Sequence, residues 1–272
     1  MRNADAIAAL EEKMRREAQE LAEQAEKEAE MARMMAPPPT PPPPEKITLS
    51  VAIMAHESRR AWVEEILERT GLGEDRVAWD TDGIRWHTGR RAWELIDPDA
   101  SHGVVLQDDV LPCLDLIPGM EKALEYVPPR TSVSLFYGAP REIPSAAERR
   151  WAPDRVRTAQ RAIEERASWV VLPRLTWGPA FVVPTDVIPS MLEWCDTRTY
   201  PEYDKRVGRY VVDILHWPCW YPWPSPVEHR GTESLCGHGH CYAYQFLGAD
   251  VSALEVDWSG PVIWHEHVRR RE

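Results

Sequence analysis

Two adjacent carboxylates follow a short apolar run near the middle of the sequence. Residues 102–107 predict a buried strand, and Asp108 and Asp109 come directly after it. In open α/β sheets, ligands bind at the carboxyl ends of the strands. Because two neighbouring carboxylates oppose each other's ionisation, a divalent cation would stabilise the pair, and carboxylate oxygens suit Mg²⁺ or Mn²⁺. The pair therefore indicates a metal site that could also hold substrate phosphates, or else a turn in which one Asp caps a helix and the other is solvated.

A strand, a helix and a second strand are predicted ahead of this pair. They cover residues 47–56, 57–70 and 77–80. This order implies a right-handed parallel crossover, and with the later segments it predicts an α/β fold with a mixed sheet flanked by helices. The residues expected on the inner face of the helix are Ala61, Trp62, Ile66 and Leu67.

The second half of the chain carries further strand and helix patterns. Residues 169–172 and 179–184 predict a pair of strands on either side of a Trp177-Gly178 turn. Prolines alternate with aromatic residues at 217–226, which excludes a helix and predicts a rigid wall. Another strand is expected at 131–138, a surface helix or mobile loop at 140–167, and helices near residues 89–96, 114–126, 185–194 and 202–216.

Composition divides the chain into four segments. Residues 1–36 lack Gly and Pro and predict one helix with a thin apolar stripe, which either pairs with a second copy or a partner or stays solvated. Residues 37–45 form a proline-rich spacer with polyproline II character. The catalytic domain is expected at 46–258, and residues 259–272 form a C-terminal tail with a basic end.

Charge and cysteine content limit the function classes. The 272-residue chain has a net charge of −12, which argues against non-specific nucleic-acid binding but leaves room for a local basic pocket. The sequence contains neither an apolar run long enough to span a membrane nor a signal-peptide core, so a cytoplasmic location is expected, in the host cytoplasm if the gene is phage-encoded. The five cysteines are odd in number and are expected to be reduced.

Three short segments resemble one enzyme family. Residues 106–110 (LQDDV) resemble the strand-end DxD motif of metal-dependent glycosyltransferases with the GT-A fold. Residues 177–183 (WGPAFVV) resemble the strand that lines the acceptor side in that class, and residues 226–235 (PVEHRGTESL) resemble a segment whose histidine is often the second metal ligand. The nearest likeness is to family 25, which includes lipopolysaccharide and collagen glycosyltransferases, and to related small enzymes of actinobacteria and their phages. It covers about residues 47–240.

The resemblance implies a GT-A-like, Rossmann-like sheet and the transfer of a sugar from a UDP- or GDP-linked donor to a protein or glycan acceptor. Asp109 and His229 would hold Mn²⁺ or Mg²⁺, and Asp108 would support the metal or the donor ribose. Gln107 stands where the family usually has an acid. Other positions expected to contact the donor are His56, Glu57, Arg59, Asp80, Asp82, Trp177 and Gly178.

The chemistry of three further groups of side chains suggests roles in binding or catalysis. Arg90 and Arg91 could hold a diphosphate at the sheet edge or form an exposed helix face. An inverting transfer needs a carboxylate to accept the acceptor's proton, and Asp204 is the expected catalytic base, the alternative being a charge at a helix N-terminus. His238 could approach the donor phosphates from a glycine-rich loop. The alternative there is a zinc site built from Cys236, His238, His240 and Cys241, whose spacing is cramped for four tetrahedral ligands.

Two rival functions remain open at this level. One is a metal-dependent nuclease or phosphotransferase that uses Asp108 and Asp109. The other is a non-catalytic assembly protein in which the N-terminal helix and the proline spacer dock an α/β binding domain onto a larger structure. A nucleotide-sugar glycosyltransferase accounts for the largest number of the motifs.

Overall fold

The computed structural model describes residues 46–139, 146–230 and 241–266, with side chains from residue 152 onward in the second range. The chain divides into two compact units, Met1–Pro41 and Pro42–Glu272. The first unit, with its predicted helix, lies outside the described residues, as do Cys236, His238 and His240. The second unit contains the carboxylate pair.

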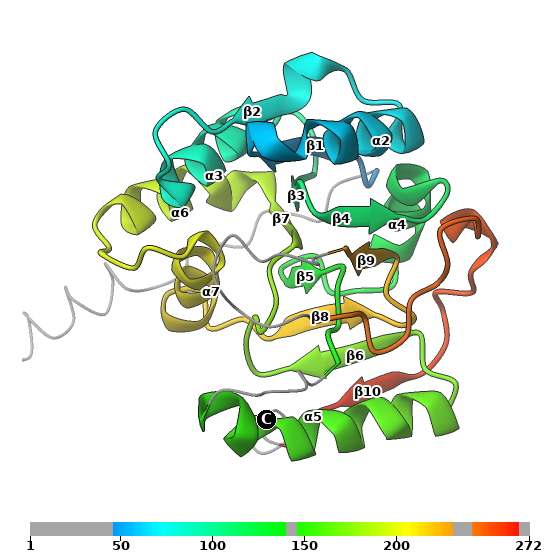
Figure 1. The fold of residues 1–272 in the computed structure, drawn as a ribbon. Coiled ribbons are helices and arrows are strands. Elements are labelled where there is room, and N and C mark those ends of the chain that lie inside the picture. Colours follow the sequence, from blue (N-terminus) through cyan, green and yellow to red (C-terminus); the bar gives the residue numbers. More distant parts are fainter. Residues whose placement is uncertain (1–45, 140–145, 231–240, 267–272) are drawn as a thin grey trace, which may run out of the picture. The chain divides into compact units, whose positions relative to one another are not determined.

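In the described residues, eight strands form one mixed sheet (Figure 1), which confirms the predicted α/β class. Parallel and antiparallel neighbours both occur in it. In sheet order the strands are β10 (Val262–Trp264), β6 (Trp169–Leu172), β8 (Cys219–Pro222), β5 (Ser132–Ser134), β7 (Ala180–Pro184), β3 (His102–Gln107), β1 (Leu49–Ala55) and β2 (Val77–Trp79).

The strands β2, β1 and β3 are parallel, and β7 runs antiparallel to β3. Ala55 pairs with Trp79, and Met54 pairs with Gln107, so the three parallel strands end at the same edge of the sheet. The turn after β3 leads into β4 (Val110–Pro112), which forms a separate two-stranded antiparallel sheet with β9 (Val227–His229). This pairing places His229 beside the turn that carries the carboxylate pair.

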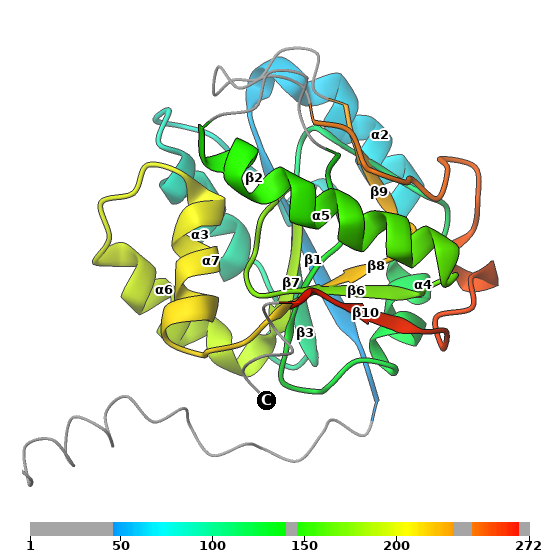
Figure 2. The same cartoon turned by 90° about the horizontal axis from the view of Figure 1, so that it is seen from below.

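Helices cover the sheet. The helix α3 (Arg85–Glu94) packs against β1, β2 and β3, and α5 (Ala146–Glu164) packs against β6 and β10 (Figure 2). The helix α2 (Arg60–Thr70) contacts β1 and β4 and ends at Gly71, whose left-handed conformation (φ 72°) suits glycine. The remaining helices are α4 (Leu116–Leu124), α6 (Ile188–Asp196) and α7 (Tyr203–Asp213), with short 3₁₀ turns at Glu57–Arg59, Glu74–Arg76, Thr185–Val187 and Ala253–Glu255.

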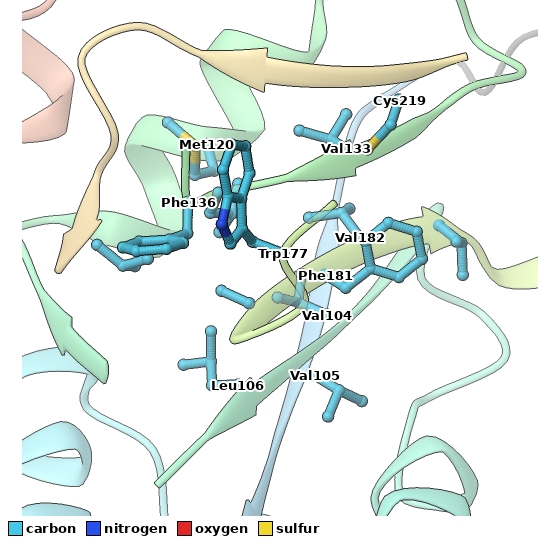
Figure 3. Packing of buried hydrophobic residues seen from close by; sticks show 14 of the residues in the cluster. Val104, Val105, Leu106, Met120, Val133, Phe136, Trp177, Phe181, Val182 and Cys219 are labelled. Carbon is cyan, nitrogen blue, oxygen red and sulfur yellow. The ribbon is translucent and has the colours of Figure 1, made fainter. Parts of the chain in front are cut away.

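The strand β3, which leads to the carboxylate pair, lies in the hydrophobic core together with β7. Both faces of β3 and β7 are buried, as expected for strands in the middle of a sheet covered on both sides. Trp177 and Phe136 meet edge to face in this core, with ring centroids 6.4 Å apart (Figure 3). Cys113, Cys195 and Cys219 are free and buried, and Cys241 is also buried. No helix of the described residues has the length and apolar character needed to cross a bilayer.

Four local predictions were wrong. The strands β6 and β7 do not pair with each other, because β8 and β5 lie between them. The stretch predicted as a rigid wall contains the central strand β8, and the segment predicted as a tail contains the edge strand β10. In α2, Ala61 is exposed and Val63 is buried in its place.

Candidate functional site

Asp108 and Asp109 lie in the tight turn between β3 and β4. Each is only 6% exposed. The backbone carbonyl of Asp109 accepts a hydrogen bond from the backbone N–H of Arg230 (2.8 Å), so the residue after β9 closes the turn. Two carboxylates are therefore held side by side, largely out of water, at the carboxyl end of a central strand.

A single arginine joins the two carboxylates. Nη1 of Arg59 donates to Oδ1 of Asp108 and to Oδ2 of Asp109, both at 2.6 Å. Arg59 belongs to the 3₁₀ turn that follows β1, and the backbone N–H of His56, at the start of that turn, donates to Oδ2 of Asp108 at 2.7 Å. The end of β1 thus supplies a positive charge to the site.

His229 reaches the site from the distant strand β9. Its Nε2 lies 3.3 Å from Oδ2 of Asp109, and its ring packs 5.9 Å from the ring of Phe136. Because β4 and β9 pair with Val110 opposite His229, backbone hydrogen bonding fixes this approach. Asp108, Asp109 and His229 thus lie together, although 120 residues separate the two segments in sequence.

The two carboxylates differ in acidity. Burial favours the protonated form of Asp109, but the hydrogen bond and charge of His229 and the charge of Arg59 outweigh it and lower the pKa of Asp109. Burial raises the pKa of Asp108, and the attraction of Arg59 only partly offsets it, while the neighbouring Asp109 adds to the increase. Asp109 is therefore the more firmly ionised member of the pair.

Asp109 and His229 could hold a divalent ion only as a partial ligand set. Among the described residues, no group of three or more His, Cys, Asp or Glu side chains is arranged to bind a metal by itself. Oδ1 of Asp109 and Nδ1 of His229 are buried and have no hydrogen-bond partner in the described structure. Since Mg²⁺ and Mn²⁺ are often held by one or two protein ligands together with substrate phosphates, these two residues fit such an ion once a diphosphate is bound.

The acidic residues after β2 have local roles. Oδ1 of Asp80 accepts hydrogen bonds from the backbone N–H of Gly83 (3.1 Å) and from the hydroxyl of Thr88 (3.0 Å). Asp82 lies 2.7 Å from Nδ1 of His87, and its Oδ1 accepts a hydrogen bond from the backbone N–H of Ile84, just before α3. These residues line the same edge of the sheet as Asp108, but their described contacts shape the loop after β2.

Two other predicted donor contacts have different partners. The carboxylate of Glu57 pairs with Arg60, which stacks over the ring of Trp79 at 4.2 Å. Arg90 pairs with Glu94 and with Asp196 on α6, so it is turned toward the helices.

Arg91 and Trp177 also differ from the prediction. Arg91 donates to the backbone carbonyl of Trp79 (3.0 Å), which ties α3 to the end of β2. Trp177 is buried among aromatic rings, with its centroid 5.0 Å from that of Tyr137, so its face is part of the core and is not open to a ligand.

Gly178 connects the carboxylate pair to Asp204. The side-chain amide of Gln107 donates to the carbonyl of Gly178 at 3.1 Å. A Cβ atom placed on Gly178 would lie 2.4 Å from Cβ of Asp204, so only glycine allows α7 to approach this closely. Asp204 is half-buried, and burial raises the pKa of its carboxyl group.

Beyond Gly178 lies a cavity of about 530 Å³ that includes Asp204 in its lining. Its cationic residues were missed from the sequence because they come from separate elements: Arg155 from α5, Arg174 from the loop after β6, and Lys205 and Arg209 from α7. The remaining lining residues are Leu172, Pro173, Leu175, Thr176, Gly208, Val212 and His265.

Comparison with known proteins adds no assignment. No family model matches the chain, and no curated protein matches it by sequence.

Proposed function

We propose that this protein is a glycosyltransferase that binds a nucleoside-diphosphate sugar at the carboxyl end of β3. The observation that carries the proposal is the convergence of Asp108, Asp109 and His229 beside the ends of β1 and β2. The sequence motifs that resemble the DxD and histidine segments of GT-A enzymes are separate in the chain, and their side chains meet in this fold. The mixed α/β sheet is compatible with the fold that the resemblance implies.

Donor binding is assigned to the carboxylate side of the site. Asp109 and His229 would hold a divalent ion, which stabilises the charge of the departing diphosphate when it is bound. Asp108 receives hydrogen bonds from the backbone of His56 and from Arg59, so its position is fixed before the donor arrives. The fixed geometry means that little reorganisation accompanies binding.

Proton removal from the acceptor is assigned to Asp204. In this step the acceptor hydroxyl oxygen forms a bond to the anomeric carbon, the bond from that carbon to the diphosphate breaks, and the hydroxyl proton passes to the Asp204 carboxylate. Direct displacement of this kind inverts the anomeric configuration. The raised pKa of Asp204 makes it a stronger base than an exposed aspartate.

Nucleotide binding by the full chain tests the proposal. Thermal unfolding would be followed with UDP, GDP or ADP, each with and without Mn²⁺, and release of nucleotide from UDP- and GDP-sugars would be measured in parallel. Stabilisation by one nucleoside diphosphate that depends on Mn²⁺ and disappears in Asp109→Asn is expected. An equal response in Asp109→Asn, or no response to any nucleotide, would overturn the assignment and favour a binding module instead.

A further inference from the structure

The cavity beyond Gly178 is lined mainly by basic side chains among its charged residues, although the protein as a whole is acidic. The chain carries a net charge of −12. Yet within the described residues, the lining of this cavity has four basic side chains of Arg and Lys and one carboxylate, that of Asp204. A concentration of positive charge in one hollow of an acidic protein attracts anions locally, while the remaining surface repels them.

The arginines are close enough to repel one another. Burial, together with the charges of Arg155 and Arg209, lowers the pKa of Arg174, although it remains protonated at neutral pH. The guanidinium of Arg155 stacks over the ring of Trp177 at 4.9 Å, which restricts its orientation. A bound anion would relieve this repulsion, and the stacked arginine would already be in place to meet it.

The acidic neighbours of these cations lie outside the lining. Arg209 pairs with Asp213 at 3.3 Å and Lys205 approaches Glu202 at 3.9 Å, and neither acid faces the cavity. Both pairs are half-exposed, so solvent screening leaves each worth little. Among the described lining residues, the basic side chains of Arg and Lys outnumber the acidic ones by four to one.

We propose that this cavity is the acceptor site of the enzyme and that it selects an acceptor bearing a phosphate or carboxylate group close to the hydroxyl that is glycosylated. The inference rests on the proposed function. The arginines bind the anionic group, and Asp204 meets the neighbouring hydroxyl. A volume of about 530 Å³ suits one sugar unit with its anionic substituent.

Asp204 lies where the cavity meets Gly178. It lines the cavity and also lies against Gly178, whose carbonyl is hydrogen-bonded to Gln107 next to the carboxylate pair. An acceptor held by its anionic group would therefore present its hydroxyl toward the donor side. The cations position the acceptor, and the carboxylate takes its proton.

Binding of small probes to the full chain tests the inference. Glucose 6-phosphate, glucuronate and glucose would be titrated calorimetrically at low salt, with UDP and Mn²⁺ present at saturation so that the donor site is filled. At least one anionic probe is expected to bind ten or more times more tightly than glucose, and to weaken as salt is added. Which of the two binds more tightly identifies the anionic group as a phosphate or a carboxylate.

The variant Arg174→Gln/Arg209→Gln is expected to weaken that binding at least tenfold, because two charged hydrogen-bond donors are lost. The matched control is Arg157→Gln/Arg166→Gln, which removes the same charge from exposed residues outside the cavity and should leave binding unchanged. Equal binding of glucose and both anions, or an equal loss in the two double variants, would overturn the inference.

The two proposals fail in different ways. If UDP binding with Mn²⁺ is normal but no anionic probe binds, the acceptor inference is wrong and the donor assignment stands. If the anionic probes bind, in titrations with and without nucleotide, while Asp109→Asn leaves nucleotide binding unchanged, the donor assignment is wrong and the cavity remains an anion site.

Discussion

Two charged regions lie on either side of Gly178, and they are built in opposite ways. On one side, two buried carboxylates are balanced by Arg59 and His229 at distances of 2.6 to 3.3 Å. On the other, basic side chains from separate elements surround a cavity with Asp204 as the lone acid among the described lining residues. The first region is rigid and its charges are paired within the protein. The second has more basic than acidic side chains in its described lining.

Under the proposed function, the two regions would take different parts in catalysis. The Asp108 carboxylate accepts a hydrogen bond from the backbone of His56, and the backbone carbonyl of Asp109 is bonded to Arg230, so the pair is expected to keep its geometry with or without a donor. The cavity instead gathers basic side chains from α5, α7 and the loop after β6, so affinity there is expected to depend on the ligand's charge. Substitutions on the two sides should therefore give separable effects, and the following predictions are arranged from the largest expected effect to the smallest.

The largest effect is expected for Asp109→Asn. The change removes the carboxylate that pairs with Arg59 and His229, both of which remain in a largely buried site. We expect Mn²⁺-dependent nucleotide binding to be lost, sugar transfer to fall by about 10³-fold or more, and unfolding free energy to drop by roughly 3 kcal/mol. The exposed Asp250→Asn is the control and should leave all three measurements unchanged; a similar loss there would show that the effect is one of overall charge.

Asp204→Asn is expected to reduce transfer by about 10²- to 10⁴-fold, the usual effect of removing a general base. Nucleotide binding should stay normal, because Asp204 lies on the cavity side of Gly178. Single-turnover transfer and nucleotide titration separate the two effects. A variant that transfers sugar at the wild-type rate would remove Asp204 from the mechanism.

The same variant should be more stable than the wild type at neutral pH. Burial raises the folded-state pKa of Asp204 above its unfolded value, so ionising this group costs stability as the pH rises. Below the unfolded pKa both states are protonated, and Asp204→Asn should have no advantage. Its advantage should grow as the pH rises from the unfolded pKa through the folded one and then level off, which denaturant titrations from pH 3 to pH 8 can follow. A lower stability at pH 7 would contradict the sign.

Gly178→Ala should affect both regions by a smaller amount. The new methyl group would lie 2.4 Å from Cβ of Asp204, so the loop or α7 must shift. We expect a loss of about 1–3 kcal/mol in stability and a roughly tenfold loss of transfer. Gly208→Ala is the matched control on α7: its Cβ would lie 3.2 Å from Cβ and Cδ2 of Leu175, so circular dichroism should register a smaller loss. Equal losses would mean that Gly178 has no special role.

The carboxylate region was largely predictable from the sequence, for a physical reason. A buried strand followed by Asp108 and Asp109 is a local pattern, and the parallel crossover before it obeys a general rule of chain handedness. The approach of His229 came from the family resemblance. Hydrophobic periodicity alone could not predict the approach of His229 to the carboxylate pair. The pairing of β4 with β9 that produces this approach joins distant segments of the chain.

The cationic region was not predictable in this way. Its side chains come from α5, α7 and the loop after β6, and each looks like an ordinary exposed charge in its own segment. The positions of β8 and β10 were also missed. The strand β8 lies in a proline- and aromatic-rich stretch without the polar–apolar alternation that is typical of a strand, and β10 is short. Strand order is set by pairing between distant segments, which local patterns do not encode.

The smallest effect is expected at Gln107, where the enzymes that this chain resembles usually have an acid. The amide of Gln107 donates to the carbonyl of Gly178, and a carboxylate there would oppose that carbonyl with negative charge. Gln107→Glu should cost about 1–2 kcal/mol at pH 7, the loss of one hydrogen bond and the repulsion that replaces it.

The pH dependence gives Gln107→Glu its sharpest test. A protonated glutamic acid can donate to the Gly178 carbonyl, whereas the ionised form cannot, so the folded state should raise the pKa of the new group. The stability deficit should therefore be small at acidic pH and increase as the pH rises through that raised pKa. Gln107→Met removes the donor without adding charge, and its deficit should be independent of pH. The Gln107→Glu variant could instead match the stability of the wild type at pH 7 and bind Mn²⁺ more tightly. In that case the amide does not link the two regions, and position 107 matters only as part of the metal site.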